Sequence, residues 1–582
     1  MIKLLTFEPN APKKHLYTMY EFIHYPQETE YSMILRVISI LITTSFISGY
    51  AAFSGSDYSE AMRMAVKFYG AQRCGNTHNW MLHENKELKT PPVCHTKDAY
   101  DGHDMSGGWH DCGDHIKVAT TMGYAAICLL SAYDVWPKAF EDNYDTAYNG
   151  PNGIPDVLDE AKVATDYFLK SLIDNKTFVY YLGGDQDHNK WVTSSYQSTL
   201  SASEGGDPRP SMASTSSGGA QVADYASALA LMAKHYPDQT YAAKCKAAAI
   251  SYYDWAKSHQ SNISIPSFYS SPNSEISDEL SLAAILLYHL TKTESYKTDA
   301  LNYLKEKWES NSALAWDTKA DISYYYIVKA DPNAKNSSGG FYRNFLAKNV
   351  SKGIAGVGSN QYGFPWGFLS NAWGTNKLAC GSAFAAALLG KLLEDKVITS
   401  VDPAVTADQA YSYNAKIVDY MLGNNEFKHP FLHGYKGDMT HRVHHRNAMG
   451  RDDNPPTATK NSAPFMFASG ALIGGPSAAN SFQNIIEGGS AFMETESGCD
   501  YNGPFIGAQA NIVSKLDPKT PVRKLPLNKN INPSFRNAAK SFVDIRGRTI
   551  QATGIPGTSG IYFVNEQTAS HSRLSKIIST GK

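Results

Sequence analysis

The sequence lacks an excess of charge of either sign. Of its 582 residues, 53 are lysine or arginine and 55 are aspartate or glutamate, so the formal net charge is −2. Nucleic-acid binding depends largely on clustered lysine and arginine side chains that neutralise phosphate groups. We therefore expect no nucleic acid among the partners of this protein, which we expect to be a monomer.

Cysteine is also scarce, and its count is odd. Seven cysteines in a chain of this length do not make a disulfide scaffold of the kind that small secreted domains use. The sequence also contains no His-Glu-x-x-His motif, which argues against a catalytic zinc protease.

Long apolar runs are absent except at residues 33–52. There, Arg36 precedes an apolar run from Val37 to Ile47, and small residues follow. This pattern is typical of a secretory signal peptide, and the run is too short for a membrane anchor. We expect a secreted or cell-surface protein without stable membrane insertion. Residues 1–32 resemble no targeting segment, and we expect them to be disordered or not translated.

Helical periodicity dominates from about residue 55 to residue 425. In 155–173, apolar residues recur at intervals of three and four, and Pro155 suits the first turn. Long loops rich in glycine, serine and asparagine are expected at 174–218 and 335–380, and such loops are usually functional. The pattern predicts an all-α domain, an α/α barrel, over 53–530. The other helices are expected near 56–70, 115–134, 219–236, 241–257, 278–292, 297–308, 382–394 and 405–422.

The last forty residues have a different pattern. Ser541 to Ile550 and Gly560 to Asn565 are typical of short strands, and 576–578 is a third candidate. We expect a small β module over 540–582. From about residue 543 onward it resembles the β sorting domains that direct proteins across bacterial outer membranes, and an accessory module of no special role is the alternative.

Two stretches of carboxylates are candidates for acid–base chemistry. Asp111 and Asp114 lie three residues apart in a glycine-rich turn before a helix, where they could hold a water molecule for hydrolysis. They could equally cap the helix or bind a cation. Glu496 is followed by Asp-Tyr-Asn-Gly, and a neighbouring carboxylate or partial burial could keep it protonated as an acid. An isolated acidic loop is otherwise simply solvated.

A third cluster, residues 441–446, contains three histidines and two arginines. From its residues alone it could bind a metal, contact a polar ligand or lie on a loop without a specific role.

Together these three stretches resemble glycoside hydrolase family 9, the inverting cellulases with an (α/α)6 barrel. Residues 111–114 are similar to the family's Asp-Ala-Gly-Asp motif, with Cys112 in the alanine position. Residues 443–446 are similar to its Pro-His-His-Arg motif, with valine in place of proline. Residues 496–503 are similar to the segment that supplies the acid. The resemblance covers roughly residues 55–510 and includes weaker matches at 152–160, 184–191 and 420–425.

The resemblance implies a role for each matching residue. Asp114 would be the general base, Asp111 its partner in holding the attacking water, and Glu496 the general acid. The residues expected to contact the sugar are His444, Arg446, Tyr501 and Trp316. For Trp316, a place in the hydrophobic core is about as readily expected as one in the substrate groove. The implied activity is endo-hydrolysis of β-1,4-glucosidic bonds in cellulose or a related β-glucan.

Other functions remain open at this point. An exo-acting hydrolase of short β-glucans or amino-sugar oligomers would share the same carboxylates. A glycan-binding protein without catalysis is disfavoured because all three carboxylates are present. The residues that border the expected cleavage point, such as 436–438 and 450–456, depart from the family pattern and leave the exact glycan open.

A set of two cysteines and two histidines precedes the first carboxylates. Cys74, Cys94, His95 and His110 could be zinc ligands, or free thiols, a disulfide and unrelated histidines. The set resembles that of a zinc-containing subgroup of the same family, which implies a structural zinc ion because four protein ligands leave no position for water. His103 and His115 are the reserve ligands. Calcium is also implied by the family, and Asp185 and Asp187 are candidates for a site that we do not place.

Overall fold

The computed structural model describes most of the chain from residue 53 to residue 516, and four strands beyond it. The chain divides into two units, Met1–Ala51 and Ala52–Lys582. The predicted signal peptide and the segment before it lie outside the described residues. Within the described part, no helix has the length and apolarity needed to span a bilayer. The described residues are 53–75, 93–144, 151–265, 269, 276–304, 313–369, 373–438, 443–449, 468–482, 492–516, 541–544, 549–551, 560–568 and 571–579.

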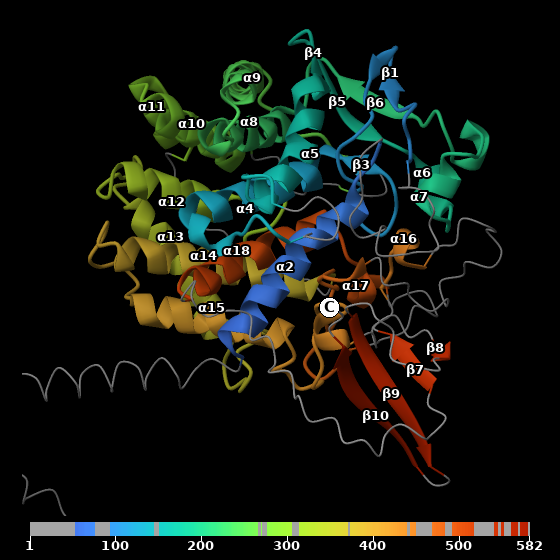
Figure 1. Ribbon diagram of the computed structural model, residues 1–582. Helices are drawn as coiled ribbons and strands as arrows, with labels where there is room; N and C mark the ends of the chain where they lie inside the picture. The colour runs from blue at the N-terminus through green and yellow to red at the C-terminus, as the bar shows by residue number, and fades with distance from the viewer. Residues whose placement is uncertain are drawn as a thin grey trace, which may run out of the picture. The chain divides into compact units, whose positions relative to one another are not determined.

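The main domain is an (α/α)6 barrel, as predicted (Figure 1). Six inner helices contact one another in a closed ring, in which the last helix packs against the first. These are α4 (Ala119–Val135), α8 (Gly219–His235), α10 (Ser277–Thr291), α12 (Ala320–Ala330), α14 (Thr375–Glu394) and α18 (Cys499–Ser514).

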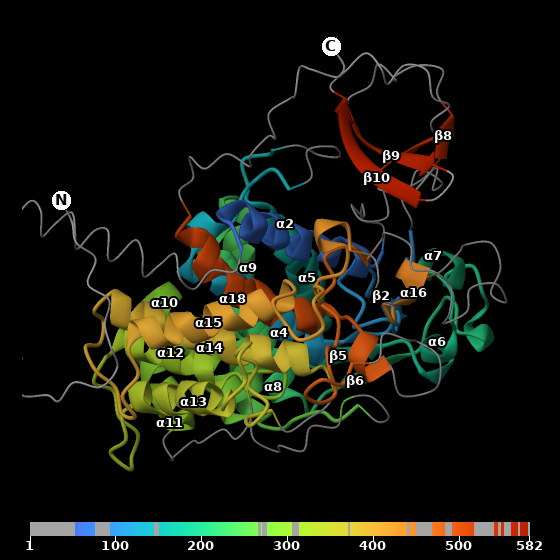
Figure 2. The same cartoon turned by 90° about the horizontal axis from the view of Figure 1, so that it is seen from below.

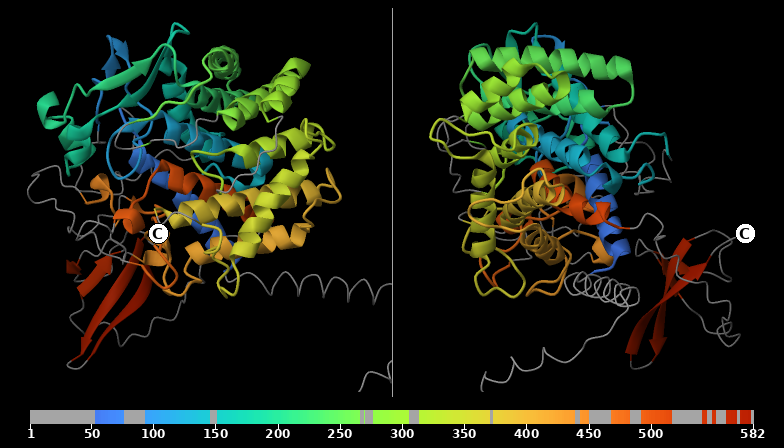
Figure 3. Two further views of the ribbon diagram at one scale, coloured as in Figure 1. Left: turned by 180° about the vertical axis from the view of Figure 1, so that it is seen from behind. Right: turned by 90° about the vertical axis from the view of Figure 1, so that its left-hand side faces the viewer.

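Each inner helix packs against an outer helix, so that the barrel has two layers (Figures 2 and 3). The inner helix α4 is apolar on all sides and almost entirely buried, as a helix enclosed by others must be. The outer helices are α2 (Gly55–Gln72), α5 (Asp156–Ser171), α9 (Gln239–Ser258), α11 (Glu294–Tyr303), α13 (Tyr342–Gly356) and α15 (Ala407–Met421).

The predicted loop at 174–218 contains regular structure. Strand β5 (Thr177–Leu182) pairs with β3 (Lys117–Val118), β4 (Leu172–Ile173) and β6 (Ser211–Ser214), always antiparallel. Two short helices, α6 (Asp185–Asn189) and α7 (Ser194–Gln197), lie between β5 and β6. A further pair, β1 (Ala99–Tyr100) and β2 (His103–Asp104), precedes the first carboxylates.

The predicted loop at 335–380 is wrong, because α13 and the first turns of α14 occupy much of it. In α13 the buried residues Tyr342, Phe345, Leu346 and Val350 recur at helical intervals. Polar residues between them gave the stretch the composition of a loop.

Helix α18 was also not predicted. Gly503 and Pro504 lie inside it and disfavour a helix by intrinsic propensity. The fold overrides that propensity because Gly503 lies against α4, where an added Cβ would come within 3.1 Å of Cβ of Cys128. The residue therefore allows the first and last helices of the ring to pack closely.

The C-terminal strands form an antiparallel sheet in the order β10-β9-β7-β8. Residues 541–550 do not make one strand, because β7 (Ser541–Asp544) and β8 (Thr549–Gln551) pair with each other. Strand β9 (Gly560–Thr568) pairs along its whole length with β10 (His571–Ser579). A role of this sheet in sorting stays a prediction.

Candidate active site

Backbone hydrogen bonds bring together three segments that lie far apart in the sequence. The amide of Cys499 donates to the carbonyl of Asp111 at 3.0 Å, and the amide of Arg446 donates to the carbonyl of Gly113 at 2.8 Å. The amide of His444 donates to the carbonyl of Thr495 at 2.9 Å. The three motifs that the sequence singled out therefore form one site.

Two glycines permit this close approach. A Cβ on Gly113 would lie 2.0 Å from the carbonyl oxygen of His444, and a Cβ on Gly498 would lie 2.7 Å from Sγ of Cys112. Any side chain at Gly113 would push the loop of Asp111 and Asp114 away from the His444 segment.

Asp114 is held as a carboxylate. Its Oδ2 accepts a hydrogen bond from Nδ1 of His188, on α6, at 2.7 Å. Burial alone would raise the pKa of Asp114, but the hydrogen bond from His188 and the charge of Arg446 outweigh it and lower the pKa. Oδ1 is buried and has no hydrogen-bond partner among the described residues. That oxygen is therefore available to a water molecule.

Asp111 has the opposite tendency. Its Oδ2 accepts a hydrogen bond from the hydroxyl of Tyr269 at 2.6 Å, and its Oδ1 accepts one from Thr121. Burial and the neighbouring charge of Asp114 raise the pKa of Asp111 well above its usual range. The two aspartates therefore differ sharply in their ease of ionisation.

Glu496 is held as an acid. Its Oε2 accepts hydrogen bonds from Nε1 of Trp373 at 2.9 Å and from the hydroxyl of Tyr501 at 3.3 Å. Burial raises its pKa to about 7, which the Trp373 hydrogen bond opposes and the charge of Asp114 reinforces. A base and an acid with separated pKa values are what acid–base hydrolysis requires.

His444 and Arg446 both lie against Trp191. The ring centroid of His444 is 4.7 Å from that of Trp191, and the guanidinium carbon of Arg446 is 4.9 Å from it. Arg446 is buried, and it donates to the carbonyls of Lys190 and His188. Its guanidinium thus holds the segment that carries His188, while the sugar contacts predicted for His444 and Arg446 stay predictions.

The other two predicted contact residues, Tyr501 and Trp316, differ from each other in burial and in surroundings. Tyr501 is fully buried and contacts Glu496, so its position beside the acid is as expected. Trp316 is partly exposed and packs edge-on against Tyr269 with ring centroids 5.2 Å apart. The two rings line one small pocket, together with Asn262 and Asp317. Trp316 therefore borders the site rather than filling the core.

Sequence reasoning missed four residues of this site. His188 belongs to the stretch 184–191, which the resemblance included without assigning it a role. Trp373 lies just before α14 and Lys377 lies in its first turn, and no helical pattern in the sequence links the two. Tyr269 pairs with Ile265 in an isolated β-bridge, and no local pattern in the sequence marks it.

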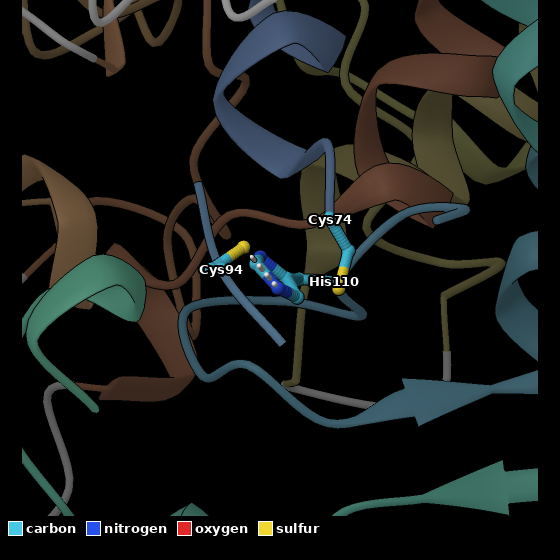
Figure 4. Close-up of side chains that lie close together, drawn as sticks. All are labelled: Cys74, Cys94 and His110. Atoms are coloured by element: carbon cyan, nitrogen blue, oxygen red, sulfur yellow. Dashed lines mark hydrogen bonds between the residues drawn. The ribbon is translucent and has the colours of Figure 1, made fainter. Parts of the chain in front are cut away.

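Three of the four predicted zinc ligands converge. The ligand atoms of Cys74, Cys94 and His110 lie within 4.8 Å of one another, and all three residues are buried (Figure 4). Backbone hydrogen bonds join Gly75 to Cys94 in both directions. The amide of His110 donates to the carbonyl of Gln72 at 2.6 Å. The backbone therefore fixes the three ligands independently of a metal.

The fourth predicted ligand, His95, lies beside this group but outside it. Its ring centroid is 5.6 Å from that of His110, and its Nδ1 lies 2.9 Å from Oδ1 of Asp207. Its Nε2 is buried without a hydrogen-bond partner among the described residues. A carboxylate on one ring nitrogen and an open second nitrogen is the arrangement typical of a metal-binding histidine.

The two reserve ligands, His103 and His115, lie at different distances from the group of Cys74, Cys94 and His110. His103, on β2, takes no part in the group, and its Nε2 lies 2.9 Å from the carbonyl oxygen of Lys170 on α5. His115 is closer, with its ring 5.0 Å from that of His110 and its Nε2 buried without a described partner.

The candidate calcium ligand Asp187 pairs with an arginine through one of its oxygens. Its Oδ2 lies 2.7 Å from Nη1 of Arg209, while its Oδ1 is buried without a hydrogen-bond partner among the described residues. A calcium site there stays a prediction. The seven cysteines, all of them among the described residues, form no disulfide bond.

The chain resembles known proteins over most of its barrel domain. A model described as "Glycosyl hydrolase family 9" matches residues 58–509, which is more than half of the chain. Endoglucanase A of Fibrobacter succinogenes is 36% identical over 271 residues, which cover 44% of this chain and 59% of that protein. Endoglucanase A of Bacillus pumilus is 27% identical over 479 residues, which cover 78% of this chain and 66% of that protein. The chain therefore spans less than two thirds of the length of these two relatives.

Solved structures agree with the fold. The cellulase Cel9M of C. cellulolyticum matches with a TM-score of 0.64 and 26% identity, over 79% of this chain and 99% of that one. A second structure of that cellulase contains cellobiose.

Proposed function

The chain belongs to glycosyl hydrolase family 9, and from that premise we propose that it is an endo-acting hydrolase of β-1,4-glucosidic bonds in cellulose or a related β-glucan. The names of the relatives support this substrate class, because both are endoglucanases. The cellobiose in the related cellulase supports a polysaccharide partner.

The observation that carries the proposal is the opposite ionisation of two carboxyl groups in one site. Asp114 has a lowered pKa and an unpartnered Oδ1 within the described residues, so it can accept a proton from water. Glu496 has a pKa raised to about 7, so it can donate one. Inverting glycosidases need this division of labour.

The reaction proceeds in one displacement. Oδ1 of Asp114 takes a proton from a water molecule, whose oxygen attacks the anomeric carbon. The bond from that carbon to the glycosidic oxygen breaks, and this oxygen receives the proton of Glu496. Asp114 ends protonated and Glu496 ionised, and exchange with solvent restores both. Asp111, fixed by Tyr269 and Thr121, orients the base loop and helps to hold the water.

The stereochemistry of the product tests this mechanism. Hydrolysis of a soluble β-glucan followed by proton NMR should give the α-anomer first. A β-anomer as the first product would exclude inversion. The ratio of viscosity loss to new reducing ends tests the endo mode, because internal cleavage lowers viscosity early, whereas an exo-acting enzyme releases sugar with little change in viscosity.

Matched variants test the assignment of the acid and the base. Glu496→Gln and Asp114→Asn should each remove nearly all turnover while the thermal unfolding transition is kept. Glu494→Gln is the control, because Glu494 lies two residues from the acid and its carboxylate accepts from the amide of Ser477 instead. Activity retained in Glu496→Gln would show that another group is the acid.

A structural zinc ion is part of the same proposal. Cys74, Cys94 and His110 would hold it, with Nε2 of His95 as the fourth ligand. The fit is supported by the convergence of three buried ligand atoms and by the buried, unpartnered nitrogen of His95 within the described part of the chain. Four protein ligands leave no position for water, so the ion would cross-link the chain beside Asp111 and take no part in bond cleavage.

Export completes the proposal. The pattern at 33–52 supports a secreted or cell-surface protein. N-terminal sequencing of the protein recovered from the medium would test it.

A further inference from the structure

The start of helix α14 reaches the start of helix α18 through an ion pair. Nζ of Lys377 lies 2.7 Å from Oδ2 of Asp500, whose side chain is fully buried, while that of Lys377 is 12% exposed. Asp500 lies in the first turn of α18, where a carboxylate is favoured by the helix dipole. The pair therefore joins two inner helices at the side of the barrel that carries the active site.

Lys377 also contacts the residue that bonds the acid. Its Nζ lies 4.3 Å from the ring centroid of Tyr501, whose hydroxyl donates to Oε2 of Glu496. Gly374 makes room for this packing. A Cβ there would lie 2.9 Å from Cε of Lys377 and 3.1 Å from the hydroxyl of Tyr501.

The same helix start supplies the second donor. Trp373 precedes α14 and donates from Nε1 to Oε2 of Glu496. Among the described residues, both hydrogen bonds to this carboxyl group therefore end on Oε2. A neutral carboxyl group carries its proton on one oxygen, and Oε1 is the one that these donors leave to it.

We propose that Lys377 is a positioning residue for the proton donor, because its ion pair with Asp500 and its contact with Tyr501 keep Oε2 of Glu496 toward the protein and Oε1 toward the substrate. This inference rests on the proposed function, in which Glu496 is the acid. Lys377 does not touch the reacting atoms, so it acts only through its neighbours.

The two charges of the pair act on Glu496 with opposite signs. The charge of Asp500 raises the pKa of Glu496, and that of Lys377 lowers it, both as smaller effects beside burial. The base responds to other groups, since burial, His188, Arg446 and His115 set the pKa of Asp114. The titratable and charged groups that act on Glu496 are Asp114, Asp500, Lys377, Arg446, Cys112, Tyr269 and Tyr501.

Substitutions of the two partners should therefore move the pH profile in opposite directions. Lys377→Met leaves Asp500 uncompensated, so the high-pH limb of kcat/KM should move up by about one pH unit. Asp500→Asn leaves Lys377 uncompensated, so the same limb should move down. The low-pH limb, which reports Asp114, should stay in place in both variants.

Conservative and remote variants separate positioning from a structural role. Lys377→Arg should restore the limb and most of kcat, because it keeps a cation beside Asp500. Lys391→Met is the control on the same helix, since Lys391 pairs with Asp395 near the other end of α14. That variant should match the wild type in both limbs.

The full-length chain is assayed on a soluble β-glucan, and each variant is checked by its thermal unfolding. Opposite shifts of the high-pH limb support the inference, and no shift or shifts of one sign overturn it. If Lys377→Met does not fold, a downward shift in Asp500→Asn supports the inference and its absence overturns it. Glu496→Gln is run in parallel, and activity in that variant would overturn the proposed function. If Glu496→Gln is inactive but the high-pH limb is unmoved in Lys377→Met and Asp500→Asn, only the role of Lys377 is overturned.

Discussion

Nδ1 of His188 lies 2.7 Å from Oδ2 of Asp114, so a residue of the short helix α6 holds one oxygen of the base. An ionised carboxylate can only accept, which means that Nδ1 carries the hydrogen in this contact. The other oxygen of Asp114 has no partner among the described residues. The histidine thus selects which oxygen can receive a proton from water.

Replacing His188 should weaken the base. The hydrogen bond from His188 lowers the pKa of Asp114, so its loss in His188→Ala should raise that pKa. The base must be ionised to act, and the low-pH limb of kcat/KM should therefore move to higher pH. We expect kcat to fall roughly a hundredfold, within the range attributed to a lost charge-assisted hydrogen bond.

The control for this prediction is another histidine. His259→Ala removes a ring whose Nδ1 contacts the carbonyl of Trp255, on the outer helix α9. It should leave both limbs unchanged. An unmoved low-pH limb in His188→Ala would mean that His188 does not set the ionisation of the base.

Tyr269→Phe tests the support of Asp111. The substitution removes the 2.6 Å hydrogen bond to Oδ2 of Asp111 and keeps the ring that packs against Trp316. We expect kcat to fall roughly tenfold to a hundredfold, with little change in melting temperature. Tyr180→Phe, in strand β5, is the control. A Tyr269→Phe enzyme with wild-type kcat would remove Asp111 from the water-holding role.

Much of this site was predictable because its carboxylates lie in recognisable motifs. Asp111, Asp114 and Glu496 were assigned from short motifs in a fixed order, and the backbone hydrogen bonds between those motifs confirm that they meet. The barrel was predictable for the same kind of reason. Helices with strong apolar periodicity, such as α5 and α8, end within a few residues of their predicted limits.

The supporting residues were not predictable because only the folded chain selects them. Tyr269 comes to Asp111 from 158 positions away, and Trp373 comes to Glu496 from 123 positions away. Arg446 was expected to contact a sugar, but its motif does not show that it would donate to the carbonyls of His188 and Lys190. Helix α18 was hidden by Gly503 and Pro504, which its packing against α4 outweighs.

Removing a predicted ligand should remove the zinc ion. The wild-type chain should contain a single zinc ion by elemental analysis, and Cys94→Ala should contain almost none, with a lower melting temperature. Asp207→Asn should keep the ion but weaken its binding roughly tenfold to a hundredfold, because the carboxylate orients His95. Cys245→Ala, which removes a buried thiol on α9, is the control. Unchanged zinc content in Cys94→Ala would exclude this site.

A single methyl group at Gly113 should separate the motifs. Its Cβ would lie 2.0 Å from the carbonyl oxygen of His444, and backbone cannot move aside as a flexible side chain can. We expect Gly113→Ala to lower the free energy of unfolding by about 1–3 kcal/mol and to abolish most activity. Gly55→Ala is the control, because its Cβ meets only the flexible end of Leu516 at 3.1 Å. Wild-type stability and activity in Gly113→Ala would contradict the close packing of Gly113 against the carbonyl oxygen of His444.

The raised pKa of Glu496 predicts where activity is lost at high pH. Because the acid must be protonated, kcat/KM should fall as pH rises through about 7, with a tenfold loss for each further pH unit. Trp373→Phe should move this limb to still higher pH, because the hydrogen bond from Nε1 to Oε2 lowers the pKa of Glu496 and phenylalanine cannot donate it. A high-pH midpoint near the ordinary glutamic acid pKa of about 4.3 would show that burial does not hold Glu496 protonated. A limb that Trp373→Phe leaves in place would show that a group other than Glu496 titrates there.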